Sequence, residues 1–310
     1  MMKINQVVLW GHKLHSHTHS YIHYGFIKAF EHMGYKTLWL DNNDIIRDSS
    51  HIDTNIDSIN FSNSLFITEG QVDANIPIRD DCYYILHNCD PIKYKNLPKC
   101  NVMVIQVFTL DVFKHKATMI DDYSYYIDNC LFMYWATDLL PHEIDDNINK
   151  LKNNMITSNR KVCFIGMMTS PWNHVENYCI KNKYEFIQKG GFSKNNVTGN
   201  DNMMIIQQSL LAPAVQNEWQ VTNGYVPCRI FKNISYGKMG MTNNMTVYNI
   251  FNKRILYSNN INKLMDSGIE FERKSTKDKN NTLIPLMEYI RDNHTYINRI
   301  NMILNFFVRL

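Results

Sequence analysis

Glycine and proline are both scarce in this chain, with 12 glycines and 8 prolines among 310 residues. This scarcity excludes collagen, glycine-rich linkers and proline-rich scaffolds. It also makes each remaining glycine informative, because glycine is the residue that accepts left-handed backbone and close approach of another group. Hydrophobic residues make up 45% of the chain, so a packed core is expected rather than disorder.

Cysteine pairs and long apolar runs are also missing. The seven cysteines include no Cys-x-x-Cys pair, which argues against a zinc ribbon or a thioredoxin motif. Most of them stand in apolar runs such as 162–164, where a reduced cysteine packs as a small hydrophobe. No segment reaches the roughly 20 apolar residues that span a bilayer, and the first apolar stretch is too short for a signal peptide. The sequence therefore predicts a cytoplasmic protein in a reducing compartment, without a transmembrane segment.

Charge of one sign is not in excess, since 32 basic and 29 acidic side chains leave a formal net charge of +3. A dedicated nucleic-acid binder usually has a larger, clustered basic excess, so nucleic acid is expected only as a modified acceptor. Three motifs are absent: Gly-x-Gly-x-x-Gly, the P-loop and the Gly-x-Ser-x-Gly elbow. Their absence argues against a dinucleotide-binding Rossmann domain, a P-loop NTPase and an α/β-hydrolase.

The first half of the chain alternates strand and helix patterns. Apolar residues spaced by three and four from Ser20 to Met33 predict an amphipathic helix that ends at Gly34. Repeated strand–connection–strand units predict a mostly parallel sheet covered by helices. The strands are expected from short apolar runs at Val7–Trp10, Thr37–Leu40, Leu65–Thr68, Tyr83–His87, Val102–Phe108 and Leu131–Trp135.

The pattern restarts after the polar residues 142–160, which are the expected boundary between a domain at 1–150 and a second at 151–310. Part of 290–310 is expected to pack on the first domain. Two α/β domains joined by a linker predict a cleft enzyme whose functional groups lie on strand-to-helix loops. The expected elements are strands at Lys161–Ile165 and Phe186–Gln188, and helices at Trp172–Lys183, Cys228–Tyr236, from Met245, and at Leu283–Phe307.

The loop after the first expected strand, residues 11–20, contains four histidines. Histidines at 15, 17 and 19 can bind a divalent metal, as in metal-dependent hydrolases. A histidine at a cleft can instead act as a general base or hold a sugar hydroxyl. The third interpretation is a polar loop whose histidines only bind backbone groups. A metal site needs further ligands at later strand ends; His87 is available there, but no full set is evident.

Two further strand ends carry polar residues. Glu69 and Gly70 follow an apolar strand, and Glu69 is either a general base, a carboxylate that positions a ligand, or a loop residue with a local hydrogen bond. His87 closes the next strand and begins a polar run that reaches residue 90. Both positions lie where a cleft is expected.

The segment from 224 to 244 is the strongest candidate site. Arg229 and Lys232 are three residues apart on an expected helix, so both project from one face before Gly237 ends the helix. A Thr/Asn-rich turn, residues 242–244, then opens another helix and offers backbone N–H groups to an anion. Together these groups predict a diphosphate site without a metal. The alternative is an ordinary pair of capped helices with a solvated basic face.

These residues resemble a known family. The pattern Pro227-x-Arg229-x-Phe231-Lys232, followed by Gly237 and the turn at 242–244, is similar to the donor-site helix of two-domain glycosyltransferases of the GT-B fold. The segments WGHKLHSHTHSYIHYGF, ITEGQVDANIP, YWATDLLPHEID and GYVPCRIFKNISYGK resemble glycosyltransferase-like proteins of large DNA viruses and phages. The resemblance spans nearly the whole chain.

This resemblance implies an α/β fold of two Rossmann-like domains facing across a cleft, with the C-terminal helix crossing back to the first domain. It places a nucleotide-sugar donor on the second domain, at Gly166, Arg229, Lys232, Asn233, Tyr236, Gly237, Thr242, Asn243 and Asn244. The acceptor side is expected at Gly11, His15, Gly70 and His87. Catalytic candidates are His17, His19 and Glu69, with His17 or His19 as the base if the anomeric configuration inverts.

The function implied is transfer of a sugar from a nucleoside diphosphate sugar to a hydroxyl acceptor: a glycan, a protein or a modified nucleic acid. Neither a cofactor nor a metal is required, and the location is cytoplasmic, or the virion if the source is viral. Many retaining members carry a glutamate at each end of the donor helix, and Lys232 stands where the first is expected, so the stereochemical outcome is not predicted. The alternatives are a metal-dependent hydrolase that uses the histidine cluster and a non-catalytic protein that binds sugars or nucleotides.

Overall fold

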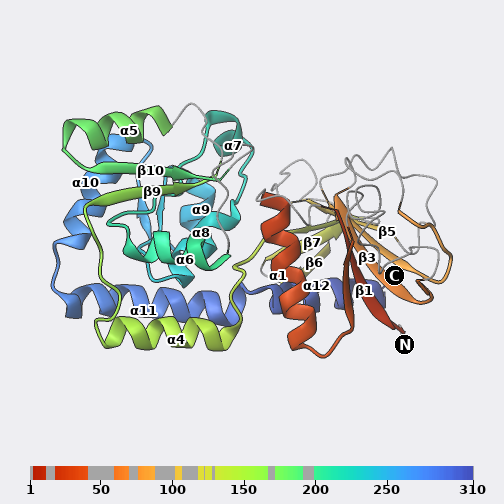
Figure 1. Cartoon of the computed structure of the whole chain (residues 1–310). Coiled ribbons are helices and arrows are strands. Elements are labelled where there is room, and N and C mark those ends of the chain that lie inside the picture. The colour runs from red at the N-terminus through yellow and green to blue at the C-terminus, as the bar shows by residue number, and fades with distance from the viewer. Residues whose placement is uncertain are drawn as a thin grey trace, which may run out of the picture.

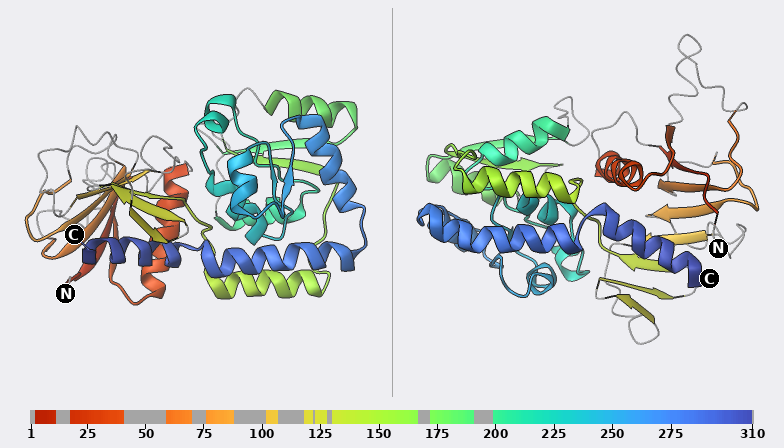
Figure 2. Two further views of the ribbon diagram at one scale, coloured as in Figure 1. Left: turned by 180° about the vertical axis from the view of Figure 1, so that it is seen from behind. Right: turned by 90° about the horizontal axis from the view of Figure 1, so that it is seen from below.

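The computed structural model describes residues 3–11, 18–40, 59–69, 76–87, 102–106, 118–121, 123–127, 130–166, 172–190 and 199–309. Its elements form two lobes, which lie side by side in Figure 1 and in both views of Figure 2. The sheet lobe contains β1 to β8 with α1 and α12, and the C-terminal lobe contains β9 to β12 with α4 to α11. No helix in the described ranges is long and apolar enough to cross a membrane.

The strands of the sheet lobe form one eight-stranded sheet in the order β2-β1-β3-β4-β5-β8-β7-β6. All neighbouring pairs from β2 to β8 are parallel, and β7 is antiparallel to both β8 and β6. The mostly parallel sheet is confirmed, whereas the antiparallel β6 and β7 were not predicted. The elements of this half are β1 (Gln6–Trp10), α1 (Thr18–His32), β2 (Thr37–Leu40), β3 (Ser64–Glu69), β4 (Tyr83–His87), β5 (Val102–Gln106), β6 (Thr118–Asp121), β7 (Ser124–Ile127) and β8 (Cys130–Met133).

Both faces of this sheet are buried, as is typical of parallel sheets. In β1, Val7 and Leu9 pack toward α1 and α12, while Val8 and Trp10 pack into a separate apolar cluster on the other face. The order of the strands reverses between β1 and β3, because the chain first adds β2 on one side and then β3 on the other. Ligands of open α/β sheets bind at the carboxyl ends of the strands at such a switch point.

The C-terminal lobe contains a smaller open sheet. Strands β9 and β10 are parallel, and Cys163 N donates to Leu211 O at 2.9 Å, which joins the segment 210–214 to β9. Ala214 N donates to Met241 O at 2.9 Å, so the same segment reaches β11, which pairs with β12. The elements of this lobe are α4 (Pro141–Lys152), β9 (Lys161–Ile165), α5 (Trp172–Lys181), β10 (Glu185–Lys189), α6 (Gly199–Gln208), α7 (Glu218–Thr222), α8 (Cys228–Ser235), β11 (Met241–Thr242), α9 (Met245–Ile250), β12 (Leu256–Tyr257), α10 (Ile261–Glu272) and α11 (Thr276–Asn293). The chain then returns to the sheet lobe as α12 (Tyr296–Arg309).

The expectation of a polar linker at 142–160 is wrong for its first part, because residues 141–152 form α4. Ile144 and Ile148 are buried four residues apart, and α4 packs lengthwise on α11, as Figure 2 shows. Its other buried residue is the polar Asn147, which donates to Ser235 O at 3.2 Å, so the apolar stripe of α4 is narrow and its sequence appears polar. Leu140 N donates to the Glu143 carboxylate at 2.7 Å and fixes the start of the helix.

The single helix expected at 283–307 is interrupted and forms α11 and α12. Thr137 N donates to His294 O at 3.1 Å, which joins the strand-like segment before α4 to the break. Thr295 then caps α12, its N–H donating to Asn298 Oδ1 at 2.9 Å. The buried Arg299 donates to the carbonyl of Tyr134 at 2.6 Å. These contacts direct α12 against α1 and beneath the sheet (Figure 2).

Candidate functional site

Two glycines close the carboxyl edge of the small sheet. Gly166 follows β9 with a φ of 145°, and Gly190 follows β10 with a φ of 79°. The backbone N–H of Gly166 donates to Lys189 O at 2.7 Å, which ties the two strand ends together. A Cβ atom at Gly166 would lie 2.5 Å from Nη2 of Arg229. The missing side chain therefore makes room for this guanidinium.

Arg229 lies in the first turn of α8 and is held over the end of β9. Its Nε donates to Ile165 O at 3.1 Å, and its guanidinium carbon lies 4.1 Å from the centroid of the Phe164 ring. Burial lowers the pKa of Arg229. Within the described ranges no carboxylate pairs with this guanidinium, so its remaining N–H groups are available to an oxyanion.

Lys232 lies one helical turn further along α8 and is only 5% exposed. Its Nζ approaches Asn202 Oδ1 at 3.4 Å and lies 5.1 Å from the centroid of the Tyr21 ring. Burial lowers its pKa to about 8, and the neighbouring Arg229 charge adds to this effect. Of the residues that the structure describes, none forms a salt bridge with it. A buried and a half-buried cation that have no anionic partner in the described ranges are an arrangement that favours a polyanionic ligand.

A carboxylate network joins α8 to the sheet lobe directly behind these cations. The Tyr21 hydroxyl donates to Asp138 Oδ1 at 2.9 Å, and the Tyr236 hydroxyl donates to the same atom at 2.7 Å. Burial, and next the Asp138 charge, raise the pKa values of both tyrosines well above 10. The two phenols are therefore permanent O–H donors to the carboxylate, and through Asp138 they link α1 to the C-terminal end of α8.

The switch point of the sheet lobe carries a buried histidine pair. His23 Nδ1 lies 2.9 Å from Gly11 O, and its Nε2 lies 2.8 Å from His87 Nε2. In the neutral pair the Nδ1–H of His23 donates to the Gly11 carbonyl, so Nε2 of His23 accepts the proton of His87. The Trp39 indole also donates to Gly11 O at 3.0 Å. This pair holds the end of β1 at the position where an acceptor site is expected.

Several predicted residues are not placed in full. His15, His17 and Gly70 lie outside the described residues. His19 belongs to the first turn of α1 and Glu69 is the last residue of β3, in register with His87, but only their backbone positions are described. Their catalytic roles therefore stay predictions.

The Thr/Asn turn before α9 uses its polar groups internally. Thr242 Oγ1 accepts from Asn244 N at 3.1 Å, and Asn244 Oδ1 accepts from Thr246 N at 2.9 Å. The Asn243 side chain exchanges two hydrogen bonds of 2.8 Å with the backbone of Gln216. The N–H groups of Asn244 and Thr246 thus already have side-chain partners, contrary to the expectation that this turn offers them to a diphosphate.

Three other residues expected at the donor site lie elsewhere. Asn233 is buried and donates to Ala212 O at 2.7 Å, which ties α8 to the small sheet. Tyr236 is fully buried in the Asp138 network. Gly237 lies at the opposite end of α8 from Arg229, against the side chains of α4. The side-chain hydrogen bonds of Asn233 and Tyr236, and the position of Gly237 one helix length from Arg229, do not favour the donor contacts expected of these three residues, and those roles stay predictions.

The sequence did not single out Tyr21, Asn202 or the Phe164 ring, which surround the two cations. Their contacts join segments far apart in the chain, so no local pattern marks them. A metal-binding alternative gains no support from the described ranges, since no group of three or more His, Cys, Asp or Glu side chains there could hold an ion. His87 uses its Nε2 on His23 instead.

Comparison with models of known protein families finds no match, and comparison with curated proteins finds none either. Among solved structures, the chain is similar to one described as "alpha-glucosyltransferase (AGT) in complex with UDP". The similarity has a TM-score of 0.59, covers 99% of this chain and 100% of that chain, and comes with 6% sequence identity. At this identity the likeness concerns the fold. The mixed α/β arrangement of parallel strands and covering helices is thus one on which a UDP-bound glucosyltransferase is also built.

Proposed function

We propose that this protein is a GT-B-type glycosyltransferase that takes a sugar from a nucleoside diphosphate sugar. The observation that carries the proposal is a pair of neighbouring cations, the half-buried Arg229 beside Gly166 and the buried Lys232, which stand without carboxylate partners in the described ranges. A diphosphate would supply the missing negative charge. The similarity of the fold to a UDP-bound glucosyltransferase supports this choice of ligand.

In this proposal the two lobes are the two Rossmann-like domains, and the chain crosses between them at 134–138 and 293–296. The C-terminal lobe holds the donor and the sheet lobe holds the acceptor. The sugar C1–O bond to the diphosphate breaks, a bond to the acceptor oxygen forms, and the acceptor proton passes to a base. His17, His19 and Glu69 are the candidates for that base.

The cations stabilise the leaving diphosphate. Charge develops on its oxygens as the C1–O bond breaks, and preorganised donors in a buried site lower the energy of that state. Arg229 would give N–H groups in a fixed plane, and Lys232 would give a charge one turn away. With two cations already present, we propose that transfer requires no metal; activity that survives a chelator is the expected result.

Binding of UDP tests the site. Arg229→Ala should weaken UDP binding by about 10- to 100-fold, because a charge-assisted hydrogen bond contributes about 1.5–3 kcal/mol and 1.4 kcal/mol is a factor of ten. Arg160→Ala is the matched control, since Arg160 also stacks on an aromatic ring, Tyr184 at 5.2 Å, but at the other end of β9. Titration calorimetry measures the UDP affinity of wild type and of the two variants. Equal UDP affinity of wild type and Arg229→Ala contradicts the assignment of Arg229 to the donor site.

A screen of nucleoside diphosphate sugars separates the proposal from its alternatives. Release of free nucleotide that depends on an added glycan, protein or modified nucleic-acid acceptor supports a transferase. Tight binding without turnover supports the non-catalytic protein, and stoichiometric zinc in the purified protein supports the metal-dependent hydrolase that uses His15, His17 and His19.

A further inference from the structure

A polar cavity lies at the opposite end of α8 from Arg229. Its volume is about 220 Å³, and it lies between the end of α4, the segment 154–158, the turn after α8 and the junction of α10 with α11. Figure 1 places this end of α4 and α11 on the side of the C-terminal lobe that faces away from the sheet lobe. The cavity is therefore separate from the proposed donor site.

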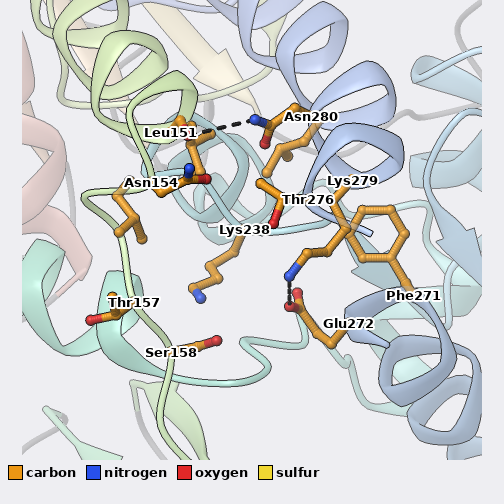
Figure 3. Close-up of a pocket in the computed structure, with 13 residues that line it drawn as sticks. Leu151, Asn154, Thr157, Ser158, Lys238, Phe271, Glu272, Thr276, Lys279 and Asn280 are labelled. Atoms are coloured by element: carbon orange, nitrogen blue, oxygen red, sulfur yellow. Dashed lines mark hydrogen bonds and ion pairs between the residues drawn. The ribbon is translucent and has the colours of Figure 1, made fainter. Parts of the chain in front are cut away.

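Lys238 extends into this cavity, as Figure 3 shows. The left-handed Gly237, with a φ of 92°, ends α8, and Lys238 N donates back to Asn233 O at 3.0 Å, which fixes the root of the side chain. Lys238 is 5% exposed, and its ammonium has no hydrogen-bond or ion-pair partner in the described ranges. Burial lowers the pKa of Lys238 to about 8. A buried ammonium without a partner is costly unless a ligand or water supplies the acceptors.

The other charges of the cavity cancel. Glu272 accepts from Lys279 Nζ at 3.1 Å, and the Glu272 side chain is 11% exposed. Lys238, Lys279 and Glu272 together therefore leave one positive charge. A ligand with one negative charge matches this balance, whereas a dianion would leave an excess negative charge beside the Glu272 carboxylate.

The remaining wall offers neutral hydrogen-bonding groups. In Figure 3 the Ser158 hydroxyl lies on the side of the cavity where the Lys238 ammonium ends, Thr157 lies on the same wall, and the amides of Asn154 and Asn280 lie on the opposite wall. The volume equals that of about seven liquid waters at ~30 Å³ each, which is room for a small polar molecule rather than a nucleotide.

We propose that this cavity binds a small hydroxylated monocarboxylate, with its carboxylate on the Lys238 ammonium and its hydroxyls against the wall formed by residues 154–158. The site is independent of the glycosyl-transfer proposal, because it shares no residue with the donor site and takes a different ligand.

Thermal shift and titration calorimetry with sodium D-glycerate test this site, with sodium chloride at equal ionic strength as the reference. Wild type should show a saturable rise in Tm with glycerate, and Lys238→Met should bind it at least about tenfold more weakly. Lys277→Met is the control, because Lys277 is exposed in the first turn of α11 and does not line the cavity. Equal glycerate binding by wild type and Lys238→Met, or no saturable shift in wild type, overturns the proposal.

A second variant tests the charge balance without removing Lys238. Glu272→Gln releases Lys279 and raises the net charge of the cavity by one, so inorganic phosphate should gain affinity relative to glycerate. In wild type glycerate should bind more tightly than phosphate. Tighter binding of phosphate in wild type, or the same preference in both proteins, contradicts the assignment to a monocarboxylate.

Discussion

Replacing Lys232 by methionine should stabilise the unliganded protein. The ammonium is 5% exposed and has only the 3.4 Å contact with Asn202 as a hydrogen bond. Its pKa falls from 10.5 to about 8 on folding. Each pKa unit corresponds to 1.36 kcal/mol, so protonated Lys232 costs the folded state about 3 kcal/mol. Methionine keeps most of the apolar length and removes the charge, so a gain of about 1–3 kcal/mol at pH 7 is expected after the contact with the Tyr21 ring is lost.

The gain should depend on pH in a defined direction. Because the folded-state pKa is lower than the unfolded-state pKa, the folded protein holds fewer protons, and raising the pH favours folding. The cost is fully present below about pH 8 and disappears between pH 8 and 10.5. The difference in stability between Lys232→Met and wild type should therefore shrink over that window, and groups common to both proteins cancel.

Urea denaturation at pH 7, 8, 9 and 10 measures this difference. Lys263→Met is the control: Lys263 is exposed on α10, so its replacement should change the free energy of unfolding by less than about 0.5 kcal/mol at every pH. A Lys232→Met protein that is less stable than wild type at pH 7, or a difference that stays constant up to pH 10, refutes the reasoning. Lys232→Met should also bind UDP more weakly than wild type. A variant that gains stability and loses UDP affinity indicates that Lys232 serves binding rather than stability.

Three further outcomes follow from the same contacts. Binding of UDP at pH 8 should be accompanied by proton uptake, since the diphosphate raises the pKa of Lys232. Calorimetry in buffers of different ionisation enthalpy measures this uptake. The uptake should vanish in Lys232→Met. Gly166→Ala should weaken UDP binding about tenfold or more in a direct titration, because the added Cβ meets the Arg229 guanidinium. Gly34→Ala is the control, since Gly34 also has a positive φ but open space around it. It should lower the free energy of unfolding by about 1 kcal/mol and leave UDP binding unchanged. Tyr21→Phe should lower the free energy of unfolding by about 1.5–3 kcal/mol in urea, since it removes a hydrogen bond to the buried Asp138 carboxylate; an unchanged midpoint would contradict this role.

The sequence predicted the elements whose own pattern of apolar residues shows which faces are buried. The parallel strands are short apolar runs buried on both faces, and β1, β2 and β4 begin or end within one residue of their predicted limits. Glycine marked the ends of several elements correctly, including the left-handed Gly34 after α1 and Gly237 after α8. Because these signals are local, they need no knowledge of the partner segment.

The misplaced elements depend on distant partners. The break between α11 and α12 lies at His294, whose carbonyl accepts from Thr137 in another segment, and the apolar stripe runs on through it without a signal. The helix α4 was missed because its buried side chains are only Ile144, Asn147 and Ile148, which form a narrow stripe with a polar residue in it. The strands β6 and β7 are short and carry tyrosines and an aspartate, which do not form an apolar run.

The candidate site likewise contains residues that local spacing predicted and residues that only the fold brings together. Spacing identified Arg229 and Lys232, because residues three apart share one face of a helix. Spacing did not predict that Tyr21, more than two hundred positions earlier, would cover Lys232, or that Asn243 and Asn244 would bind their own neighbours. Side-chain amides satisfy either a ligand or a nearby backbone group, and only the fold determines which.

The placement of positive charge on α8 and directly after it is the strongest argument for the two proposed ligand sites. Lys232 and Lys238 are buried and Arg229 is half-buried, and the pKa of each is lowered first by desolvation. None of the three has a carboxylate partner in the described ranges, although Asp138 and Glu272 are near enough to act through space. A helix optimised for stability alone would pair these cations or replace them with apolar side chains, since unpaired buried charge is destabilising. Arg229 and Lys238 lie at opposite ends of α8, so one small ligand cannot neutralise both. The two proposed ligands, a diphosphate at the carboxyl edge of β9 and a small carboxylate at the far end, would together neutralise all three cations.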